Sequence, residues 1–434
     1  MSQFHLRSRN PFQVGGLFLL FCFFLSTTVL ASEKEILKAI DGANQSLHQV
    51  SMKIYDFKEL SGQEVKSSQL LKEELARLGF KVSGDLKVPA DLVKGGVATT
   101  AFRAEMEGKG PGPTVTIMLE YDALPNGHSC GHNLISTSGL AAATGLAAVM
   151  KNTPGRILVI GTPAEEIGSS GVGKVALLEG GHFDGSDVVL ITHGGDRWNT
   201  DGRFLAMKRA TFAFRGKAAH AAASPHKGVS ALDALLLTFM GTDMLREHVR
   251  QDVRIHGVVS KGGDRYNIVP EFAQGEFAVR ALDTATMEDA YKKVVNCARA
   301  GELATGAKLE FKEPRVFLKA PITVKSYGKM VLDQARALGV ADDDIKPSTD
   351  SGSSDLGNVA YDYPTINLAF KIAPEGTAGH SDALRTAAAS DEGWKGTMVA
   401  GKTVALIAYN LLNNPAKVRE IKEQFKALKE KEGK

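Results

Sequence analysis

A short stretch near residue 125 gathers side chains that often bind transition metals in proteins. It contains Asp122, His128, Cys130 and His132, and it follows directly after the apolar run 114–119. A cysteine thiolate and an imidazole nitrogen are good ligands for metals of intermediate softness such as zinc, and neighbouring residues of one loop can converge on one ion. A buried cysteine beside a hydrogen-bonded histidine would produce the same Cys-x-His pattern. This stretch alone therefore leaves both interpretations open.

Two further apolar runs also end in residues that bind metals. Glu165 and Glu166 follow the run 156–160, and His193 follows the run 188–192. Adjacent carboxylates after a buried strand cost free energy unless a cation neutralises them, although a solvated turn would also tolerate them. A divalent ion lowers the pKa of water, and a nearby carboxylate can take up the proton and pass it to a leaving amine. One glutamate as ligand and its neighbour as general base would fit hydrolysis.

The segment after these glutamates imitates a phosphate-binding loop. Residues 168–174 have the glycine and lysine spacing of such a loop, ending at Lys174, but Val175 stands where a serine or threonine would hold magnesium. The two glutamates just upstream would also repel a triphosphate. The sequence therefore indicates no nucleotide site here.

Four residues farther along the chain have side chains suited to a hydrolase site. His380 is the natural candidate for a last metal ligand. His220 follows a predicted strand and could donate a hydrogen bond to the oxyanion of a tetrahedral intermediate. Arg280 and Asn267 lie on the predicted central strands of the same region, and the arginine could bind a substrate carboxylate through two parallel hydrogen bonds. A structural histidine and an exposed arginine on a sheet face are the alternatives.

The apolar pattern predicts an α/β fold for most of the chain. Buried strands are expected at 114–119, 156–160, 188–192 and 365–370, and helices at 33–50, 67–78, 138–150 and 324–337. Strands that alternate with helices favour a mostly parallel sheet covered by helices on both faces. In such sheets, functional sites gather where strand ends meet loops.

The middle of the chain follows a different order of elements. The pattern predicts strand, helix, two strands, helix and strand at 210–216, 230–248, 254–260, 273–282, 287–303 and 308–318. This is the order of a ferredoxin-like α+β unit. We therefore expect a discontinuous catalytic domain made of 32–206 and 319–434, with the unit 207–318 inserted into it. The length of 434 residues agrees with two domains, because one hydrophobic core rarely supports so long a chain.

Residues 1–31 have the pattern of a secretory signal peptide. Arg7 and Arg9 precede an apolar run at 17–25, and Val29 and Ala31 supply the small residues before an expected cleavage site. Cleavage would remove two arginines and no acids, so the formal net charge would fall from +3 to +1. A nearly neutral chain favours neither nucleic acid nor anionic lipid as a partner. An uncleaved membrane anchor is the alternative, but the apolar run is shorter than the roughly 20 residues that span a bilayer. We expect a periplasmic or secreted protein without stable membrane association.

The ordered set of these motifs resembles the dinuclear-metal amidohydrolases and peptidases that include aminoacylase, carboxypeptidase G and hippurate hydrolase. The resemblance spans the whole mature chain and is carried by 121–125, 130–132, 165–166, 193, 216–220, 267–270, 280 and 379–380. It implies that the inserted unit is a dimerisation and lid domain, and so a homodimer. It also implies two divalent ions in each subunit, zinc or manganese.

The same resemblance assigns expected roles to single residues. The ligands of the two ions would be Cys130, His132, Glu166, His193 and His380. Glu165 would act as general base, and Asp122 would orient the ligands from behind. His220 would polarise the substrate carbonyl, within its own subunit or in the partner subunit's site. Asn267 and Arg280 would hold the terminal carboxylate of the substrate.

One position departs from the hippurate-hydrolase pattern. Asn133 stands where that branch usually has aspartate, and with the segment 353–358 it is more similar to the p-aminobenzoyl-glutamate hydrolase and β-alanyl-dipeptidase branch. The predicted reaction is metal-dependent hydrolysis of the amide bond in a small N-acyl-amino acid or dipeptide with a free carboxylate. Two alternatives stay open: a non-catalytic binding protein with the same fold, and a deacylase of a biosynthetic intermediate, which export would disfavour.

Overall fold

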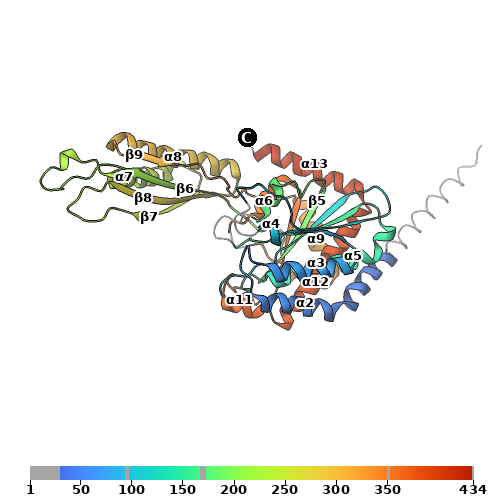
Figure 1. The fold of residues 1–434 in the computed structure, drawn as a ribbon. Helices are drawn as coiled ribbons and strands as arrows, with labels where there is room; N and C mark the ends of the chain where they lie inside the picture. Colours follow the sequence, from blue (N-terminus) through green and yellow to red (C-terminus); the bar gives the residue numbers. More distant parts are fainter. Residues whose placement is uncertain (1–29, 93–96, 167–172, 349–351, 433–434) are drawn as a thin grey trace, which may run out of the picture.

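The computed structural model describes residues 30–92, 97–166, 173–348 and 352–432. Two sheets of different size organise these residues, and each carries its own helices. We call the parts built on them the large domain and the small domain, and Figure 1 shows the small domain extending away from one end of the large domain. The predicted signal peptide lies outside the described residues except for its last two positions, and so do residues 168–172 of the loop that imitates a phosphate site.

The large domain is built on a six-stranded sheet. Its strands are β1 (Lys81–Ser83), β2 (Phe102–Glu107), β3 (Thr114–Leu119), β4 (Arg156–Gly161), β5 (Val188–Gly195) and β10 (Thr365–Lys371). Their order across the sheet is β1-β2-β4-β3-β5-β10. The neighbours from β4 to β10 are parallel, whereas β1 and β2 pair antiparallel at one edge. The predicted α/β class with a mostly parallel sheet is confirmed.

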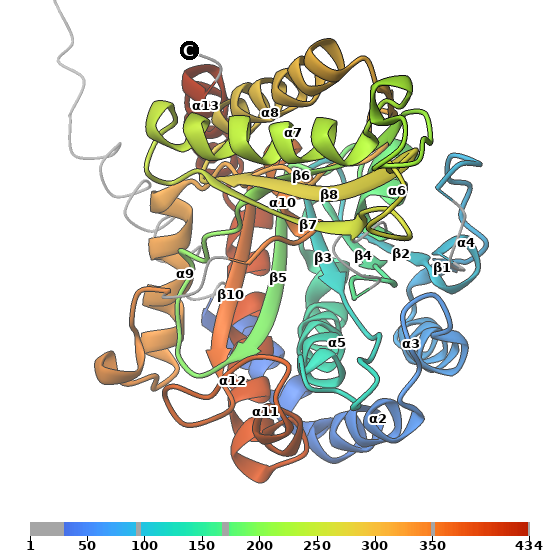
Figure 2. The ribbon, with the colours of Figure 1, turned by 90° about the vertical axis from the view of Figure 1, so that its left-hand side faces the viewer.

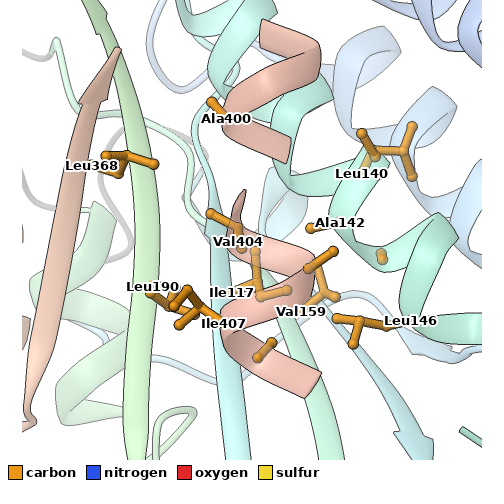
Figure 3. Packing of buried hydrophobic residues seen from close by; sticks show 14 of the residues in the cluster. Ile117, Leu140, Ala142, Leu146, Val159, Leu190, Leu368, Ala400, Val404 and Ile407 are labelled. Atoms are coloured by element: carbon orange, nitrogen blue, oxygen red, sulfur yellow. The ribbon is translucent and has the colours of Figure 1, made fainter. Parts of the chain in front are cut away.

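Helices cover both faces of this sheet, which is why its central strands read as unbroken apolar runs. Alternate strand residues such as Ile117, Val159 and Leu190 pack against one helical layer (Figure 3). The intervening residues such as Leu158 and Val189 pack against the other layer. The first layer contains α2 (Asn44–Phe57), α3 (Val65–Arg77), α5 (His132–Val149), α9 (Lys325–Ala337), α12 (Asp391–Leu412) and α13 (Pro415–Glu432). The second contains α6 (Gly173–Glu179) and α10 (Leu356–Asp362), and two short helices, α4 (Val97–Thr100) and α11 (Asp382–Ala387), lie in the connections.

The structure corrects several predicted boundaries. The helix expected at 33–50 is divided, because residues 30–42 are helical, Ala43 forms a turn and α2 then begins. The helix expected at 138–150 begins six residues earlier, so that His132 is its first residue rather than part of a loop. The strand expected at 308–318 ends as β9 at Phe311.

The small domain has the predicted ferredoxin-like order. Its elements are β6 (Ala206–Arg215), α7 (Ala231–Leu245), β7 (Arg254–Lys261), β8 (Phe272–Ala281), α8 (Thr284–Thr305) and β9 (Lys308–Phe311). The antiparallel sheet has the order β7-β8-β6-β9. Figure 2 shows α7 and α8 side by side on one face of this sheet, with β7 at its edge. Phe212, Phe277 and Tyr291 belong to the separate core that forms between the helices and the sheet.

The long strands of the small domain have one end near the large domain and one end far from it. Met207, near the start of β6, pairs with Arg280 on β8 and bridges to Leu318 on the chain that returns to the large domain. Arg215, at the other end of β6, pairs with Phe272. Because a strand rises about 3.4 Å per residue, these two ends are about 30 Å apart.

Among the described residues, one helical stretch has the length and apolar composition that could cross a membrane. It covers 132–152, and 83% of its most apolar window is buried inside the protein.

Candidate metal centre

The loop after β3 places a thiol and an imidazole side by side. Gly131 separates Cys130 from His132 and adopts a left-handed conformation with φ of 75°, which a residue with a side chain rarely adopts. The chain turns at this glycine and enters α5 at His132. Cys130 then approaches the end of β5, where its Sγ lies 3.4 Å from Nε2 of His193.

Six of the predicted site residues form one continuous cluster. Three groups of candidate ligand atoms each lie within 4.8 Å of one another: Cys130, His132 and His193; Cys130, Glu166 and His380; and His132, Glu165 and Glu166. The members come from the ends of β3, β4 and β5 and from the loop before α11. The structure therefore brings together side chains that are far apart in sequence, as the strand-end pattern predicted.

Hydrogen bonds fix two of the histidine rings so that each can present a lone pair to the cluster. Asp122 Oδ1 lies 2.9 Å from Nδ1 of His132, and the carbonyl of Gly194 lies 2.9 Å from Nδ1 of His193. A ring that donates from Nδ1 has Nε2 free to bind a metal. Nε2 of His132 is buried and has no hydrogen-bond partner among the described residues. The atoms around Nε2 of His132 are a sulfur, imidazole nitrogens and carboxylate oxygens. This set of atoms fits a divalent metal centre.

Asp122 also connects this histidine to the loop after β4. Its Oδ2 accepts a hydrogen bond of 2.9 Å from the backbone N–H of Glu166 and one of 2.6 Å from the hydroxyl of Ser61. Burial raises the pKa of Asp122, but His132 and these hydrogen bonds outweigh burial and hold the pKa well below its usual range. The carboxylate is therefore ionised, and it holds His132 and Glu166 in a fixed relation.

The electrostatic surroundings favour the thiolate form of Cys130. Burial raises the pKa of its thiol, but His132 and His193 outweigh burial and lower the pKa to about 6. Hydrogen bonds with Cys130 and Glu166 raise the pKa of His380 to about 10. Without a metal ion, the cluster thus pairs a thiolate with cationic imidazoles. The thiolate is the form of cysteine that binds zinc.

Two loops of the cluster contain strained backbone. Ala164, just before the two glutamates, has φ of 62°, and His380 has φ of 59°. Residues other than glycine rarely occupy this left-handed region, and such residues concentrate at functional sites. Nε2 of His380 reaches Oε1 of Glu166 at 3.3 Å although more than half of the histidine side chain is exposed.

His128 and Asn133, which lie in the same stretch of sequence, do not join the cluster. Nε2 of His128 lies 2.9 Å from the carbonyl of Ile54, and burial followed by repulsion from His132 lowers the pKa of His128 to about 4. Asn133 donates to Ser51 Oγ and to the carbonyl of Ala388. Both side chains connect α5 and its preceding loop to other parts of the large domain.

Glu64 is a buried carboxylate that the sequence pattern did not reveal. Its Oε1 accepts a hydrogen bond of 2.8 Å from the backbone N–H of Ala164, and its Oε2 accepts one of 3.0 Å from the hydroxyl of Thr100. It therefore supports the strained residue before the two glutamates. Burial, with a contribution from Asp122, raises the pKa of Glu64 from 4.5 to about 7.

We expect Glu64 to make the metal-free protein less stable as the pH rises. A carboxyl whose pKa is raised by folding contributes stability below its unfolded pKa of about 4.5, and this contribution is lost as the pH rises through about 7. The shift corresponds to about 3 kcal/mol. The test is urea unfolding after a chelator has removed metal from the protein. The free energy of unfolding of Glu64→Gln relative to wild type should be higher at about pH 8 than at about pH 5. An equal difference at both pH values would contradict this role of Glu64.

The cluster opens into a pocket of about 610 Å³ between the two domains. Glu165, Glu166 and His193 form part of its wall in the large domain, while Met207 and Arg280 contribute from the small domain. Arg280 donates a hydrogen bond of 3.2 Å to Ser353 Oγ, and its Nε has no hydrogen-bond partner among the described residues. The guanidinium can therefore still bind a ligand in the pocket.

The structure separates His220 and Asn267 from this pocket. His220 lies beyond Arg215, at the end of β6 far from the large domain, and Asn267 lies with it in the connection between β7 and β8 rather than on a strand. The backbone N–H of Ala221 donates to the carbonyl of Asn267 at 3.0 Å. Within one chain, Asn267 and Arg280 thus stand at opposite ends of the small sheet. They do not converge on one substrate carboxylate, which a binding site built from a single chain would require.

Comparison with known proteins places the chain in a family. The family model described as Peptidase family M20/M25/M40 matches residues 114–387. The chain belongs to this family. The match begins at β3 and includes every residue of the cluster. The protein is accordingly a hydrolase of the metallopeptidase class.

Its relatives include two groups of named enzymes. The mouse (Mus musculus) Xaa-Arg dipeptidase is 32% identical over 420 residues, which cover 92% of this chain and 94% of the mouse protein. One of the p-aminobenzoyl-glutamate hydrolase chains of Escherichia coli K12 is 32% identical over 296 residues, which cover 63% of this chain and 58% of the bacterial chain. These names favour the enzymatic interpretation of the sequence over a binding protein without activity.

Solved structures of low sequence identity share the fold. A dinuclear metal binding peptidase of the M20 family from Bacillus subtilis has a TM-score of 0.66 and 20% identity, over 86% of this chain and 99% of that chain. An aminobenzoyl-glutamate utilization protein from Klebsiella pneumoniae has a TM-score of 0.66 and 19% identity, over 86% of this chain and 97% of that chain.

Proposed function

We propose that this protein hydrolyses the amide bond of a dipeptide or a small N-acyl-amino acid that carries a free carboxylate. The observation that carries this proposal is the convergence of candidate metal ligands beside Glu165. Two divalent ions, zinc or manganese, would be held by Cys130, His132, Glu166, His193 and His380. When bound, such ions polarise a carbonyl group and lower the pKa of water.

Glu165 is placed to move the proton that the reaction requires. Ser354 Oγ donates a hydrogen bond of 2.7 Å to Oε1 of Glu165, which leaves Oε2 available for proton exchange. Burial raises the pKa of Glu165 to about 8; Lys174 opposes this shift and Glu120 adds to it. We propose that Glu165 takes a proton from water as the water oxygen bonds to the carbonyl carbon. Glu165 then gives this proton to the amide nitrogen as the C–N bond breaks, which yields a carboxylic acid and an amine; the acid then loses its own proton to become a carboxylate.

The named relatives suggest the range of substrates to test. A panel should contain dipeptides with basic, acidic and apolar C-terminal residues, p-aminobenzoyl-glutamate, and acetylated and succinylated amino acids. The proposal predicts that the metal-loaded protein releases a free amine from at least one dipeptide or from p-aminobenzoyl-glutamate. Cleavage of the acetylated or succinylated amino acids alone would favour the alternative function, a deacylase of a biosynthetic intermediate.

We propose that Arg280 binds the free carboxylate of the substrate. Charge-assisted hydrogen bonds of this kind contribute about 1.5–3 kcal/mol, so Arg280→Gln should raise KM by about 10- to 100-fold and change kcat less. Arg254, its exposed neighbour across the sheet, does not line the pocket, so Arg254→Gln serves as the control. The measurement is steady-state kinetics with a substrate and its C-terminal amide. An equal effect of Arg280→Gln on both substrates would contradict carboxylate binding.

We also propose that His220 and Asn267 act in the site of a partner subunit. Nδ1 of His220 accepts hydrogen bonds from the backbone N–H groups of Ala222 and Ala223, at 3.2 and 3.1 Å, so the neutral ring carries its proton on Nε2. The ring is thus set to donate to an oxyanion. Because these residues stand about 30 Å from their own pocket along β6, a second copy must supply the site that they complete.

The surface of the small domain supports a homodimer. Its exposed apolar side chains include Leu236, Met240 and Met244 on α7 and Val258 and Val259 on β7. In the described part of the chain, β7 pairs on one side only, with β8. Exposed apolar patches and unpaired edge strands are typical of interfaces. We propose that 207–318 forms the dimerisation and lid domain, and that the catalytic domain consists of 32–206 and 319–434.

Mixing two inactive variants tests the contribution of the partner subunit. Glu165→Gln and His220→Ala homodimers should each be inactive, but after subunits are exchanged a mixed dimer contains one intact site. Random pairing of equal amounts should restore about one quarter of the wild-type activity. Absence of recovery, with exchange shown by mass spectrometry of the native dimer, would place His220 outside the partner subunit's site.

We propose that the protein acts outside the cytoplasm after cleavage of residues 1–31. The charged, apolar and small-residue regions of this segment support export. N-terminal sequencing of the protein from the host periplasm or medium should begin at Ser32.

A further inference from the structure

Lys174 is a fully buried lysine beside the candidate metal centre. It ends the loop that imitates a phosphate site, and its side chain has an exposed fraction of 0%. A buried ammonium group is costly unless carboxylates surround it. Its Nζ lies 2.7 Å from Oε1 of Glu120 and 2.6 Å from Oδ1 of Asp355. Both carboxylates are also buried, and both belong to the wall of the pocket at the candidate metal centre.

The lysine joins three elements that the sequence keeps far apart. Glu120 follows β3, Lys174 is the second residue of α6, and Asp355 immediately precedes α10. The backbone N–H of Lys174 donates a second hydrogen bond of 2.8 Å to Oδ2 of Asp355, so that both oxygens of this carboxylate are held by one residue. Asp355 therefore has a single orientation relative to α6.

The start of α6 packs directly against the loop that carries Glu165. A Cβ atom on Gly173 would lie 1.8 Å from the carbonyl oxygen of Pro163, which is closer than any side chain can approach. Only glycine allows this contact. The position of Lys174, the next residue, is therefore fixed relative to the loop at 163–166.

From Asp355 the connection continues to the proposed general base. Ser354, the preceding residue, accepts a hydrogen bond of 3.2 Å from the backbone N–H of Leu356. Its hydroxyl proton is then directed to Oε1 of Glu165, at 2.7 Å. Lys174 fixes Asp355, and the chain next to Asp355 fixes the hydroxyl that orients Glu165. On the other side, the lysine holds Oε1 of Glu120, whose Oε2 lies 3.7 Å from Nε2 of His132.

We propose that Lys174 is a positioning residue of the hydrolytic reaction, which orients Glu165 through Asp355 and Ser354 and holds Glu120 against the metal centre. This role rests on the proposed function of Glu165 as general base. Unlike a purely structural role, this role predicts that a variant without Lys174 has a slower chemical step but still binds substrate.

The test compares Lys174→Met with a matched control. Lys208 is also a buried lysine between two carboxylates, Glu288 at 3.1 Å and Glu313 at 2.7 Å, but it lies on β6 and does not line the pocket. Removal of a group that orients active residues typically costs 10- to 100-fold in activity. Lys174→Met should lower kcat by about 10- to 100-fold with KM changed by less than about 3-fold. Lys208→Met should leave both constants near wild type.

Two measurements without turnover accompany the kinetics. Elemental analysis should find the same metal content in Lys174→Met as in wild type. A crystal structure of the variant should show Ser354 Oγ and Glu165 Oε1 separated by more than about 3.5 Å, the limit of a hydrogen bond. A folded, metal-loaded Lys174→Met protein with wild-type kcat overturns the proposal.

A second variant decides the question if Lys174→Met does not fold. Asp355→Asn keeps the shape of the side chain but removes the charge that Lys174 contacts, and it should lower kcat by about 10-fold at unchanged KM. Wild-type kcat in this variant overturns the proposal. Failure of the proposed function gives a different result, because wild-type protein would then hydrolyse no substrate of the panel. An active wild type with unaffected Lys174 and Asp355 variants rejects only the positioning role.

Discussion

Glu165→Gln should lower kcat by about 10²- to 10⁴-fold, the range expected when a general base is removed. Glutamine has nearly the shape of glutamate and can still accept the hydrogen bond that Ser354 donates to Oε1. It cannot take up a proton from water at neutral pH. The loss should therefore appear in kcat, while KM and the metal content stay close to wild type.

The neighbouring residue provides the control for this experiment. Glu166 belongs to two of the three groups of candidate ligands. Burial raises its pKa, but the hydrogen bond with His380 and the charges of His132 and His380 outweigh burial and lower it. Glu166→Gln should consequently reduce metal content as well as activity. Full activity of Glu165→Gln would show that another group moves the proton. Loss of metal from Glu165→Gln, with Glu166→Gln unaffected, would exchange the roles of the two residues.

Cys130→Ala should reduce both the number of bound metal ions and the rate of hydrolysis. The thiol belongs to two of the candidate ligand groups, with His132 and His193 and with Glu166 and His380. Removal of the thiol should lower kcat/KM by more than about 100-fold, which is the largest loss expected for a group that only orients metal ligands. Elemental analysis and kinetics at limiting metal provide the measurements.

Cys297 supplies a matched control for this variant. It is the other cysteine of the described chain, it lies on α8 of the small domain, and burial raises the pKa of its thiol. Cys297→Ala should bind two ions and retain wild-type activity. Metal binding that is unchanged in Cys130→Ala would remove the thiol from the set of ligands. An effect of equal size in Cys297→Ala would indicate general loss of stability instead.

The sequence predicted the fold well where the physical signal is local. Strands such as β3 are buried runs without charged residues because helices cover both of their faces, and β3 has the predicted bounds 114–119. Short elements without such a run were not predicted, and neither was the long buried helix α12. One short example is the edge strand β2, which alternates apolar and charged residues, and another is α6, whose first two residues are the last two of the segment that imitates a phosphate loop.

The ligand cluster was also accessible from the sequence, because parallel strands deliver their carboxyl ends to one edge of a sheet. Cys130 and Glu166 follow such ends, and His193 lies near the carboxyl end of β5; Cys130 shares one candidate ligand group with Glu166 and another with His193. The location of His220 and Asn267 relative to the pocket was not accessible. It depends on the length and direction of β6 and β8, which carry these two residues away from Arg280.

The residues around the cluster show a further limit of sequence patterns. Glu64 and Lys174 are charged residues that normally lie at the surface, and single charges in a sequence give no sign of burial. Their burial follows from the hydrogen bonds with Ala164 and with Asp355, which are contacts between distant segments. Residues 168–174 only imitate the spacing of a phosphate loop, as Val175 and the upstream glutamates indicated, and the lysine at the end of this segment forms ion pairs with two carboxylates.

The most direct test of the metal centre is a crystal structure of the manganese- or zinc-loaded protein with anomalous scattering from the metal. The structure predicts two ions in each chain, bound by Cys130, His132, Glu166, His193 and His380 at about 2.0–2.3 Å and next to the carboxylate of Glu165. Ions that bind elsewhere, or a protein that hydrolyses its substrate with no ion at these side chains, would contradict the account.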